Sequence, residues 1–251
     1  MTTADRIENM LNHLTVPETE EAVETWLAGL PRVEAPSVVS FVNAHAVNLM
    51  VKDKALFDAL TQSDTLLRDG SGMKMMMRLF GRSPGENLNG TDLIPRIIGA
   101  FTSEKSKRKR VAVIATQQPW LDKACDVIRA QGADIVLTMD GFQSEEAYVK
   151  ALMSTPADLI ILGMGMPKQE KVSMKLADAI SHPCVIVNGG AIIDFLADRF
   201  PRAPESWRKL GLEWLYRLTR EPKRLFQRYV VGNAVFLGRA ALLKAGGRGG
   251  V

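Results

Sequence analysis

The stretch "ADLIILGMGMPKQEKVSMKLADAISHPCVIVNGGA" (157–191) decides the fold, because two short apolar runs flank a segment with helical spacing. "ADLIILGMG" and "PCVIVNGGA" are typical of buried strands, and "PKQEKVSMKLADAI" between them is typical of a helix. Two strands joined by a helix usually lie parallel in one sheet. The stretch therefore predicts a parallel sheet.

The same alternation continues towards the N-terminus. Four further runs are expected strands, and each is followed by a segment of helical spacing: "SVVSFVN" (37–43), "TLLRD" (65–69), "VAVIAT" (111–116) and "ADIVLTMDG" (133–141). The first forty residues are expected to be rich in helix. The chain is thus predicted to be an α/β protein, a Rossmann-like parallel sheet with helices on both faces.

Polar residues and glycines fall at the ends of these expected strands. They are Asn43, Asp69, Asp140, Gly165 and Asn188. Ligands of open parallel sheets bind outside the carboxyl ends of the strands. We therefore expect a site built from these residues.

The segment "LLRDGSGMKM" (66–75) leaves two interpretations open for Asp69. Asp-Gly commonly marks a turn, and taken alone that interpretation is favoured. Its place at a strand end raises the second interpretation, in which Asp69 projects into a cleft as a catalytic base. The methionines that follow are expected to be helix core, because Met is a flexible apolar filler.

Two other segments carry candidate ligand-binding residues. "LGMGMPKQE" (162–170) fits neither a dinucleotide fingerprint nor a phosphate-binding Walker loop. It predicts a glycine-rich turn whose backbone amides favour an anion or a sugar hydroxyl, with Gln169 either solvated or ligand-binding. Asp194 follows a glycine pair, where it either accepts ribose hydroxyls or caps the next helix, and the cap is favoured from the residues alone.

Cysteine and histidine usage argues against a metal site built by the protein. Cys125 and Cys184 lie far apart, and only three histidines occur, so we expect reduced, buried thiols in a reducing compartment. The segment "MTTADRIENM" (1–10) shows no secretory signal, and no run of 18 apolar residues predicts a membrane span.

Positive charge is concentrated near the C-terminus. Residues 205–251, the C-terminal tail, carry a net charge of +7, whereas residues 1–204 carry −3. Apolar stripes alternate with arginines in the tail, which predicts either a basic surface helix or a segment that meets phosphates or an anionic membrane. "TSEKSKRKR" (102–110) is also basic, and is expected to be a solvated lead into a strand.

Several motifs occur together in the order expected of one family. "DGSGM", "NGTDL", "LGMGMPKQE", "RAPESWRKLGLEWLYRLTREPKR" and "FQRYVVGN" make the chain similar to the WecG/TagA/CpsF glycosyltransferases over about residues 38–233. The resemblance implies an α/β catalytic domain at 1–204. It also implies a basic, amphipathic helical appendage at 205–251 that closes the active site and attaches to the membrane.

The resemblance also implies the reaction and its setting. Members resemble inverting, metal-independent transferases that move a sugar from a UDP-sugar donor to an acceptor sugar linked to undecaprenyl diphosphate. The expected location is cytoplasmic, peripheral on the inner face of the cell membrane, with an anionic membrane surface as partner. No cofactor and no nucleic-acid partner are expected, and a homo-oligomer is left open.

The motifs assign roles to individual residues by resemblance. Asp69, in the D-G-x-G motif, is the implied general base. The implied substrate-binding residues are Asn43 in the donor–acceptor cleft, Asn87 before Gly-Thr-Asp, Gln169 near the sugar, Phe142 beside the nucleotide base, Asp194 as a strand-end aspartate by the ribose, and Arg217, Arg224 and Arg228 over the diphosphate.

One departure from the family pattern bears on the donor sugar. Asn87 stands where many members, including N-acetylmannosamine transferases, have an arginine. "NLNGTD" (87–92) is more similar to the exopolysaccharide branch, which includes the glucosyltransferase of xanthan assembly, and glucose is therefore the expected donor sugar. A UDP-N-acetylmannosamine(uronate) transferase is the alternative within the family. A non-catalytic, nucleic-acid-binding α/β protein is the alternative of a different class.

Overall fold

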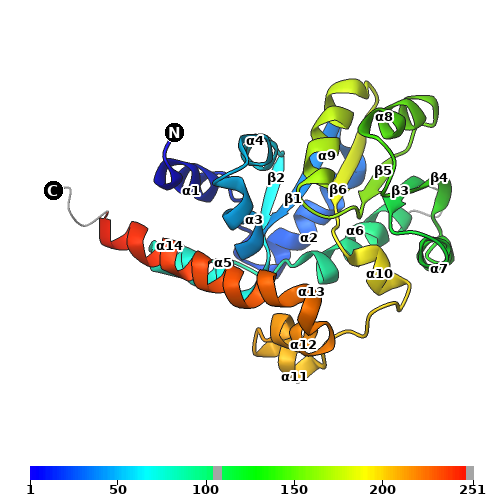
Figure 1. The fold of residues 1–251 in the computed structure, drawn as a ribbon. Helices are drawn as coiled ribbons and strands as arrows, with labels where there is room; N and C mark the ends of the chain where they lie inside the picture. Colours follow the sequence, from blue (N-terminus) through cyan, green and yellow to red (C-terminus); the bar gives the residue numbers. More distant parts are fainter. Residues whose placement is uncertain (104–108, 247–251) are drawn as a thin grey trace.

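The computed structural model describes residues 1–103 and 109–246 and contains one six-stranded sheet. Its order is β2-β1-β6-β5-β3-β4, and every neighbouring pair is parallel (Figure 1). The strands are β1 (Pro36–Val42), β2 (Thr65–Arg68), β3 (Arg110–Ala115), β4 (Asp134–Asp140), β5 (Leu159–Leu162) and β6 (Cys184–Asn188). The predicted parallel sheet is confirmed.

Helices cover both faces of the sheet, as the sequence predicts. One face packs on α2 (Glu20–Gly29), α6 (Gly90–Thr102), α7 (Trp120–Ala130) and α10 (Ile192–Leu196). The other packs on α1 (Thr3–Asn12), α3 (Ala44–Met50), α4 (Lys54–Thr61), α5 (Gly70–Leu79), α8 (Glu145–Ser154) and α9 (Lys168–Ala179). Because β3, β5 and β6 are buried on both sides, their sequences are nearly continuous apolar runs.

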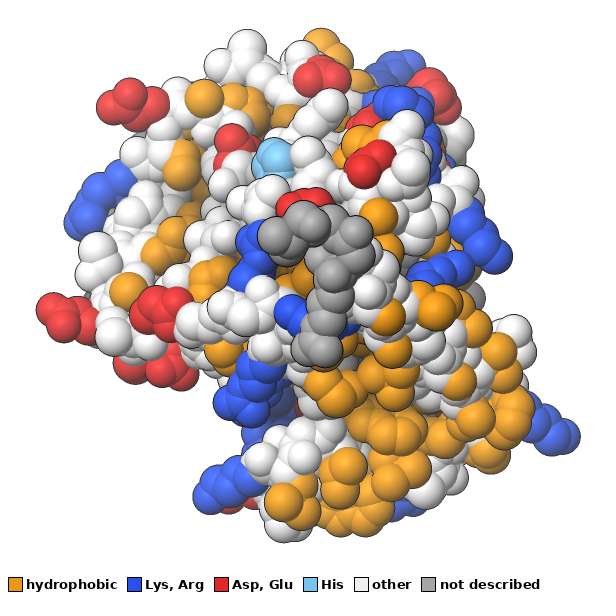
Figure 2. Space-filling model, turned by 90° about the vertical axis from the view of Figure 1, so that its left-hand side faces the viewer, with side chains coloured by type: hydrophobic (Ala, Val, Ile, Leu, Met, Phe, Trp, Pro, Cys, Tyr) orange, Lys and Arg blue, Asp and Glu red, His pale blue; other side chains and the backbone are white. Residues whose placement is uncertain are grey.

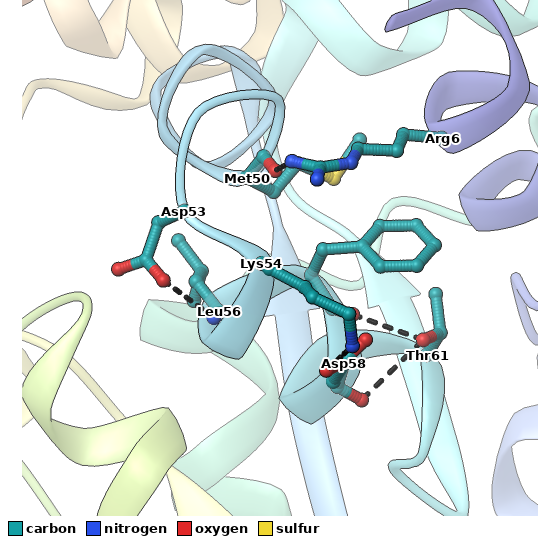
Figure 3. A network of polar contacts seen from close by, with 8 residues as sticks. Arg6, Met50, Asp53, Lys54, Leu56, Asp58 and Thr61 are labelled. Atoms are coloured by element: carbon teal, nitrogen blue, oxygen red, sulfur yellow. Dashed lines mark hydrogen bonds and ion pairs between the residues drawn. The ribbon is translucent and has the colours of Figure 1, made fainter. Parts of the chain in front are cut away.

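Local hydrogen bonds set where the helices beside β1 and β2 begin and end (Figure 3). Arg6 of α1 donates from Nη1 to Met50 O and Val51 O, both at 3.0 Å, so it satisfies carbonyls at the end of α3. Asp53 caps α4 by accepting from the Leu56 amide at 3.1 Å. These contacts hold the chain that lies between β1 and β2.

The C-terminal tail packs on α3 and α5, two of the helices that cover the sheet. It contains α11 (Glu205–Lys209), α12 (Glu213–Arg220), α13 (Pro222–Phe226), the π-helical η2 (Gln227–Val231) and α14 (Gly232–Gly246). Phe236 of α14 is 1% exposed and belongs to the same core cluster as Met73 and Met76 of α5. The tail is thus fixed by a hydrophobic anchor, while its treatment as a separate domain from residue 205 stays a prediction.

Two further sequence expectations concern particular segments. Among residues 1–103 and 109–246, no helix is long and apolar enough to cross a membrane. The basic run at 102–110 lies largely outside the described residues. Met73, Met76 and Met77 are buried, which confirms the expected role of most of the Met run, but Met75 is 49% exposed.

Candidate active site

Asp69 lies where β2 meets α5, at the carboxyl end of the sheet. Its amide donates to Val42 O at 2.8 Å, which extends the pairing of β2 with β1 by one residue. Gly70 then turns the chain with φ +83°, a left-handed conformation that glycine adopts at no steric cost. Although Asp69 occupies the N-cap position of α5, its carboxyl caps no backbone amide of that helix. The carboxyl is therefore directed elsewhere.

The partner of the Asp69 carboxyl is Asn43, at the end of the neighbouring strand. Asn43 donates from Nδ2 to Asp69 Oδ2 at 3.2 Å, and its Oδ1 accepts from the Ala46 amide to cap α3. The two strand-end residues singled out from the sequence are thus in contact. This arrangement orients the carboxyl and leaves Oδ1 of Asp69 available to a ligand.

The electrostatic environment of Asp69 combines burial with nearby arginines. Burial raises the pKa of the Asp69 carboxyl, although the Asn43 hydrogen bond and the guanidinium groups of Arg228, Arg217 and Arg68 act in the opposite direction. The residue as a whole keeps partial exposure. A carboxyl with a raised pKa is a stronger base than an ordinary one, as proton abstraction requires.

Arg217 and Arg228 reach this site from the C-terminal tail. The tail is docked there by two contacts: Ser71 Oγ donates to Gly211 O at 3.2 Å, and Asn48 Nδ2 donates to Gly232 O at 2.7 Å. Arg228 lies in the π-helical turn and is half-buried, and among the described residues its Nε has no hydrogen-bond partner. A buried guanidinium with unused donors is suited to bind a phosphate.

Arg224 differs from the other two candidate arginines of the tail, Arg217 and Arg228. Its Nε and Nη2 donate to the Glu221 carboxylate at 2.6 and 2.7 Å, and its guanidinium stacks 5.8 Å from the Phe200 ring centre. Arg217 stacks similarly on Phe195, at 5.2 Å. Arg224 must therefore share its donors with Glu221 if it contacts a ligand.

Gln169 is buried, which rules out the solvated alternative. It is 2% exposed, and its Oε1 accepts from the Gly165 amide at 3.1 Å and the Gly190 amide at 3.0 Å. Its Nε2 donates to Glu170 at 2.8 Å. The sequence predicted that the backbone amides of this turn bind a ligand, but the Gly165 amide donates to Gln169 instead. Gln169 thereby joins the turns after β5 and β6.

Phe142 stands at the end of β4 with its ring 75% exposed. The loop that carries it is held firmly: the Phe142 amide donates to Asp140 Oδ1 at 2.8 Å, and Lys168 Nζ donates to Gly141 O at 2.9 Å and Gln143 O at 2.7 Å. An exposed ring on a fixed loop can stack on a planar base. Its role beside a nucleotide stays a prediction.

Asp194 lies inside α10. The resemblance implied that Asp194 stands at the end of a strand, and this prediction is wrong. The N-cap of α10 is Ala191, without a side-chain cap, so the interpretation of Asp194 as a helix cap is also wrong. Its Oδ1 instead pairs with Arg199 Nη1 at 3.0 Å. The glycine pair lengthens the loop after β6, which places Asp194 in the first turn of the helix.

Asn87 is exposed and contacts an arginine from β2. Arg68 donates from Nη1 to Asn87 Oδ1 at 3.3 Å, and the rest of its guanidinium binds the carbonyls of Pro84, Gly85 and Glu86. Arg68 thereby pins the loop 84–87 next to Asp69. A substrate-binding role of Asn87 stays a prediction.

Sequence reasoning missed two titratable neighbours of this cluster. Burial, with Arg228 nearby, lowers the pKa of His45 to about 4, so His45 is neutral at pH 7. Burial raises the pKa of Glu213 on α12, with Arg202 and Arg217 opposing it and Asp69 adding to it. His45 stands two residues after Asn43, so its place near the site could have been inferred from the sequence. Glu213 reaches the site only because the tail folds back.

The cluster can perform one kind of chemistry well. A carboxyl with a raised pKa is oriented by an amide and faces guanidinium groups, an arrangement that can remove a proton from a hydroxyl while stabilising an anionic leaving group. The site therefore suits the attack of a hydroxyl on a substrate that carries a phosphate leaving group.

Comparisons with known proteins point in the same direction. The model of the "Glycosyl transferase WecG/TagA/CpsF family" matches residues 7–249. A relative from Bacillus subtilis (strain 168) is 27% identical over 191 residues, which cover 75% of this chain and 73% of the relative. That relative is an N-acetylglucosaminyldiphosphoundecaprenol N-acetyl-beta-D-mannosaminyltransferase.

Proposed function

Since the chain belongs to the WecG/TagA/CpsF family of glycosyltransferases, we propose that it transfers N-acetylmannosamine from a UDP-sugar to a sugar linked to undecaprenyl diphosphate. The observation that carries this proposal is the Asp69 carboxyl, oriented by Asn43 and facing arginines of the tail. The relative's activity supports the mannosamine alternative over glucose, the sugar expected from Asn87. The structure adds nothing in favour of glucose, because Asn87 binds Arg68.

The proposed mechanism is a single inverting displacement. Asp69 removes the proton from the acceptor hydroxyl as that oxygen attacks the anomeric carbon of the donor, and the bond to UDP breaks. Asn43 holds the carboxyl towards the acceptor. Because the proton ends on Asp69 and the electron pair leaves with UDP, no further co-reactant is required.

Arginines of the tail are proposed to stabilise the leaving diphosphate. Arg228 is the strongest candidate, since it is half-buried, lies near Asp69 and has an unpartnered Nε among the described residues. Arg217 adds positive charge at the same place, and Arg224 contributes by sharing its guanidinium with Glu221. Guanidinium groups can hold two phosphate oxygens at once, which is how the enzyme would act without a metal ion.

The donor is proposed to lie across the carboxyl ends of the strands. Phe142 would stack on the uracil base, and Asp194 would contact the ribose if Arg199 shares its carboxylate. Gln169 would act indirectly, by holding the turns at Gly165 and Gly190 in place beneath the sugar.

A screen of UDP-sugars tests the reaction. The purified protein should convert a diphosphate-linked N-acetylglucosamine acceptor with UDP-N-acetylmannosamine and release UDP, while UDP-glucose should give at least about tenfold lower kcat/KM. A higher kcat/KM with UDP-glucose would return the assignment to the glucosyltransferase branch. Binding to nucleic acid without transfer of any sugar would favour the non-catalytic alternative.

Attachment to the inner face of the cell membrane is part of the proposal. Large apolar side chains of the tail are exposed, and Figure 2 shows hydrophobic side chains gathered at the lower end of the molecule, where Figure 1 places α11–α13. The exposed apolar side chains of the tail include Leu210 after α11, Phe226 in α13, Val230 and Val231 in η2, and Val235 and Leu242 in α14. Lys223 is exposed beside them, and basic groups near anionic lipid each contribute about 1 kcal/mol of binding.

Point variants test attachment better than removal of the tail, because Phe236 is part of the core. Phe226→Ser and Lys223→Gln should each reduce co-sedimentation with vesicles of phosphatidylglycerol and phosphatidylcholine, and salt should weaken the binding that remains. Met153→Ser, at an exposed apolar residue on α8, is the matched control and should bind like the original protein. Unchanged co-sedimentation of both tail variants would show that this face does not bind lipid.

A further inference from the structure

An apolar groove runs between α5 and α14, away from the candidate active site. Its volume is about 440 Å³, within the range of roughly 300–1,000 Å³ found for small-ligand pockets. Met75 and Leu79 of α5 line one side, Leu237 and Ala241 of α14 line the other, and Lys244 is the only charged lining residue. The sequence marked this Met run as helix core, yet Met75 is 49% exposed here.

The two helices run side by side in the same direction, starting at the site (Figure 1). A Cβ atom at Gly72, near the start of α5, would lie 3.5 Å from the Phe236 ring. Eight residues further along both helices, Lys244 Nζ lies 5.9 Å from the centre of the Phe80 ring. The two helices are thus packed together at the Gly72 end, and the groove lies beside α5 from Met75 onwards.

The distance between Asp69 and the groove determines which part of a bound acceptor would reach the groove. At a rise of about 1.5 Å per residue, Met75 is about 8 Å and Leu79 about 14 Å along α5 from Gly70. A hexose followed by two phosphates covers a comparable length. An acceptor whose sugar hydroxyl lies at Asp69 would thus place the start of its lipid chain between these helices.

We propose that the groove between α5 and α14 binds the first isoprene units of the lipid-linked acceptor. This inference rests on the proposed function, since it requires a prenyl-diphosphate acceptor. Small side chains at Ala240 and Ala241 leave the space, and the flexible methionines opposite adapt to a branched hydrocarbon. Beyond Lys244 the rest of a long chain is free to enter the bilayer.

Photo-crosslinking tests the groove directly. The probe is N-acetylglucosamine diphosphate carrying a farnesyl-type chain that ends in a benzophenone. Labelling should fall on peptides that contain Met75, Leu79 or Leu237. Ala241→Phe and Leu79→Trp, which fill the groove from opposite sides, should each reduce labelling on the order of tenfold, because they displace buried apolar contact. Ala234→Phe places the same ring on an exposed residue of α14 that does not line the groove and should label normally.

Kinetics separate a lipid subsite from a merely structural role. Ala241→Phe should raise KM for the farnesyl acceptor on the order of tenfold and leave KM for a methyl-diphosphate acceptor unchanged. Equal losses with both acceptors, labelling spread over other helices, or undiminished labelling in both groove-filling variants would overturn the proposal. Labelling reports binding without transfer, so a labelled groove with no product would count against the proposed reaction and leave the lipid groove standing.

Discussion

Asp69→Asn removes the proposed base while keeping the shape of the side chain. Asn43 Nδ2 can still donate to the new carboxamide oxygen, as it does to Asp69 Oδ2 at 3.2 Å. The turn at Gly70 depends on the backbone and is unaffected. Turnover should fall on the order of 10²–10⁴-fold, the usual share of a general base, which corresponds to about 2.7–5.5 kcal/mol of activation free energy.

The same change should not weaken the fold. Because burial raises the pKa of Asp69, the folded state favours the protonated carboxyl. That stabilisation is complete below about pH 3.9, because 3.9 is the pKa of an Asp side chain in the unfolded state. It is lost as the pH rises through the higher pKa of Asp69 in the folded state. At neutral pH the ionised carboxylate therefore weakens the folded state, and a neutral Asn removes this cost. The Tm of Asp69→Asn should equal or exceed that of the original protein.

The assay is UDP release at saturating donor, measured from pH 4 to 9, together with thermal unfolding. In the original protein kcat/KM should rise with pH through the raised pKa of Asp69, and the variant should lose this rise. Asp53→Asn is the matched control: Asp53 also stands at a helix N-cap, where Asn caps equally well, and among the described residues it pairs with the half-exposed Lys171. A folded Asp69→Asn protein with turnover near the original level would refute the assignment.

Three further predictions concern two residues of the tail, Arg228 and Phe236, and the effect of removing metal ions. Arg228→Gln should lower kcat on the order of 10²-fold, because one group that stabilises the leaving diphosphate is lost; unchanged kcat would contradict its role. Activity should survive excess EDTA, and a loss that magnesium reverses would show that a metal stabilises the diphosphate. Phe236→Ala should lower the free energy of unfolding in urea by about 3–5 kcal/mol, since this ring is 1% exposed in the core; a change below about 1 kcal/mol would mean that α14 does not depend on it.

Most of the sheet was predictable because strands such as β5 and β6 are buried on both faces. Such strands have no polar face, so "LIIL" in β5 and "CVIVN" in β6 stand out against the helices between them. The contact between Asn43 and Asp69 was also implicit in the sequence. Each follows a strand directly, and the two strands turned out to be neighbours in the sheet.

The roles of Gln169 and Asp194 could not be derived from spacing. The Gln169 side chain joins Gly165 to Gly190, residues that belong to two different strand–helix turns, and no local pattern indicates such a bond. Asp194 was displaced from the strand end by the length of a loop. Glu213 lies near Asp69 only because the tail folds back onto the sheet. The sequence around either residue does not indicate this contact.

Docking of the tail and ionisation of Asp69 are linked through the same arginines. Arg217 and Arg228 favour the carboxylate, whereas burial disfavours it. Since these arginines come from the tail, ionisation of Asp69 favours the docked tail, and docking favours the ionised base, by the same free energy. The contacts of Gly211 and Gly232, with Phe236 in the core, hold the arginines in place. Docking of the tail therefore favours the ionised carboxylate that the proposed base requires.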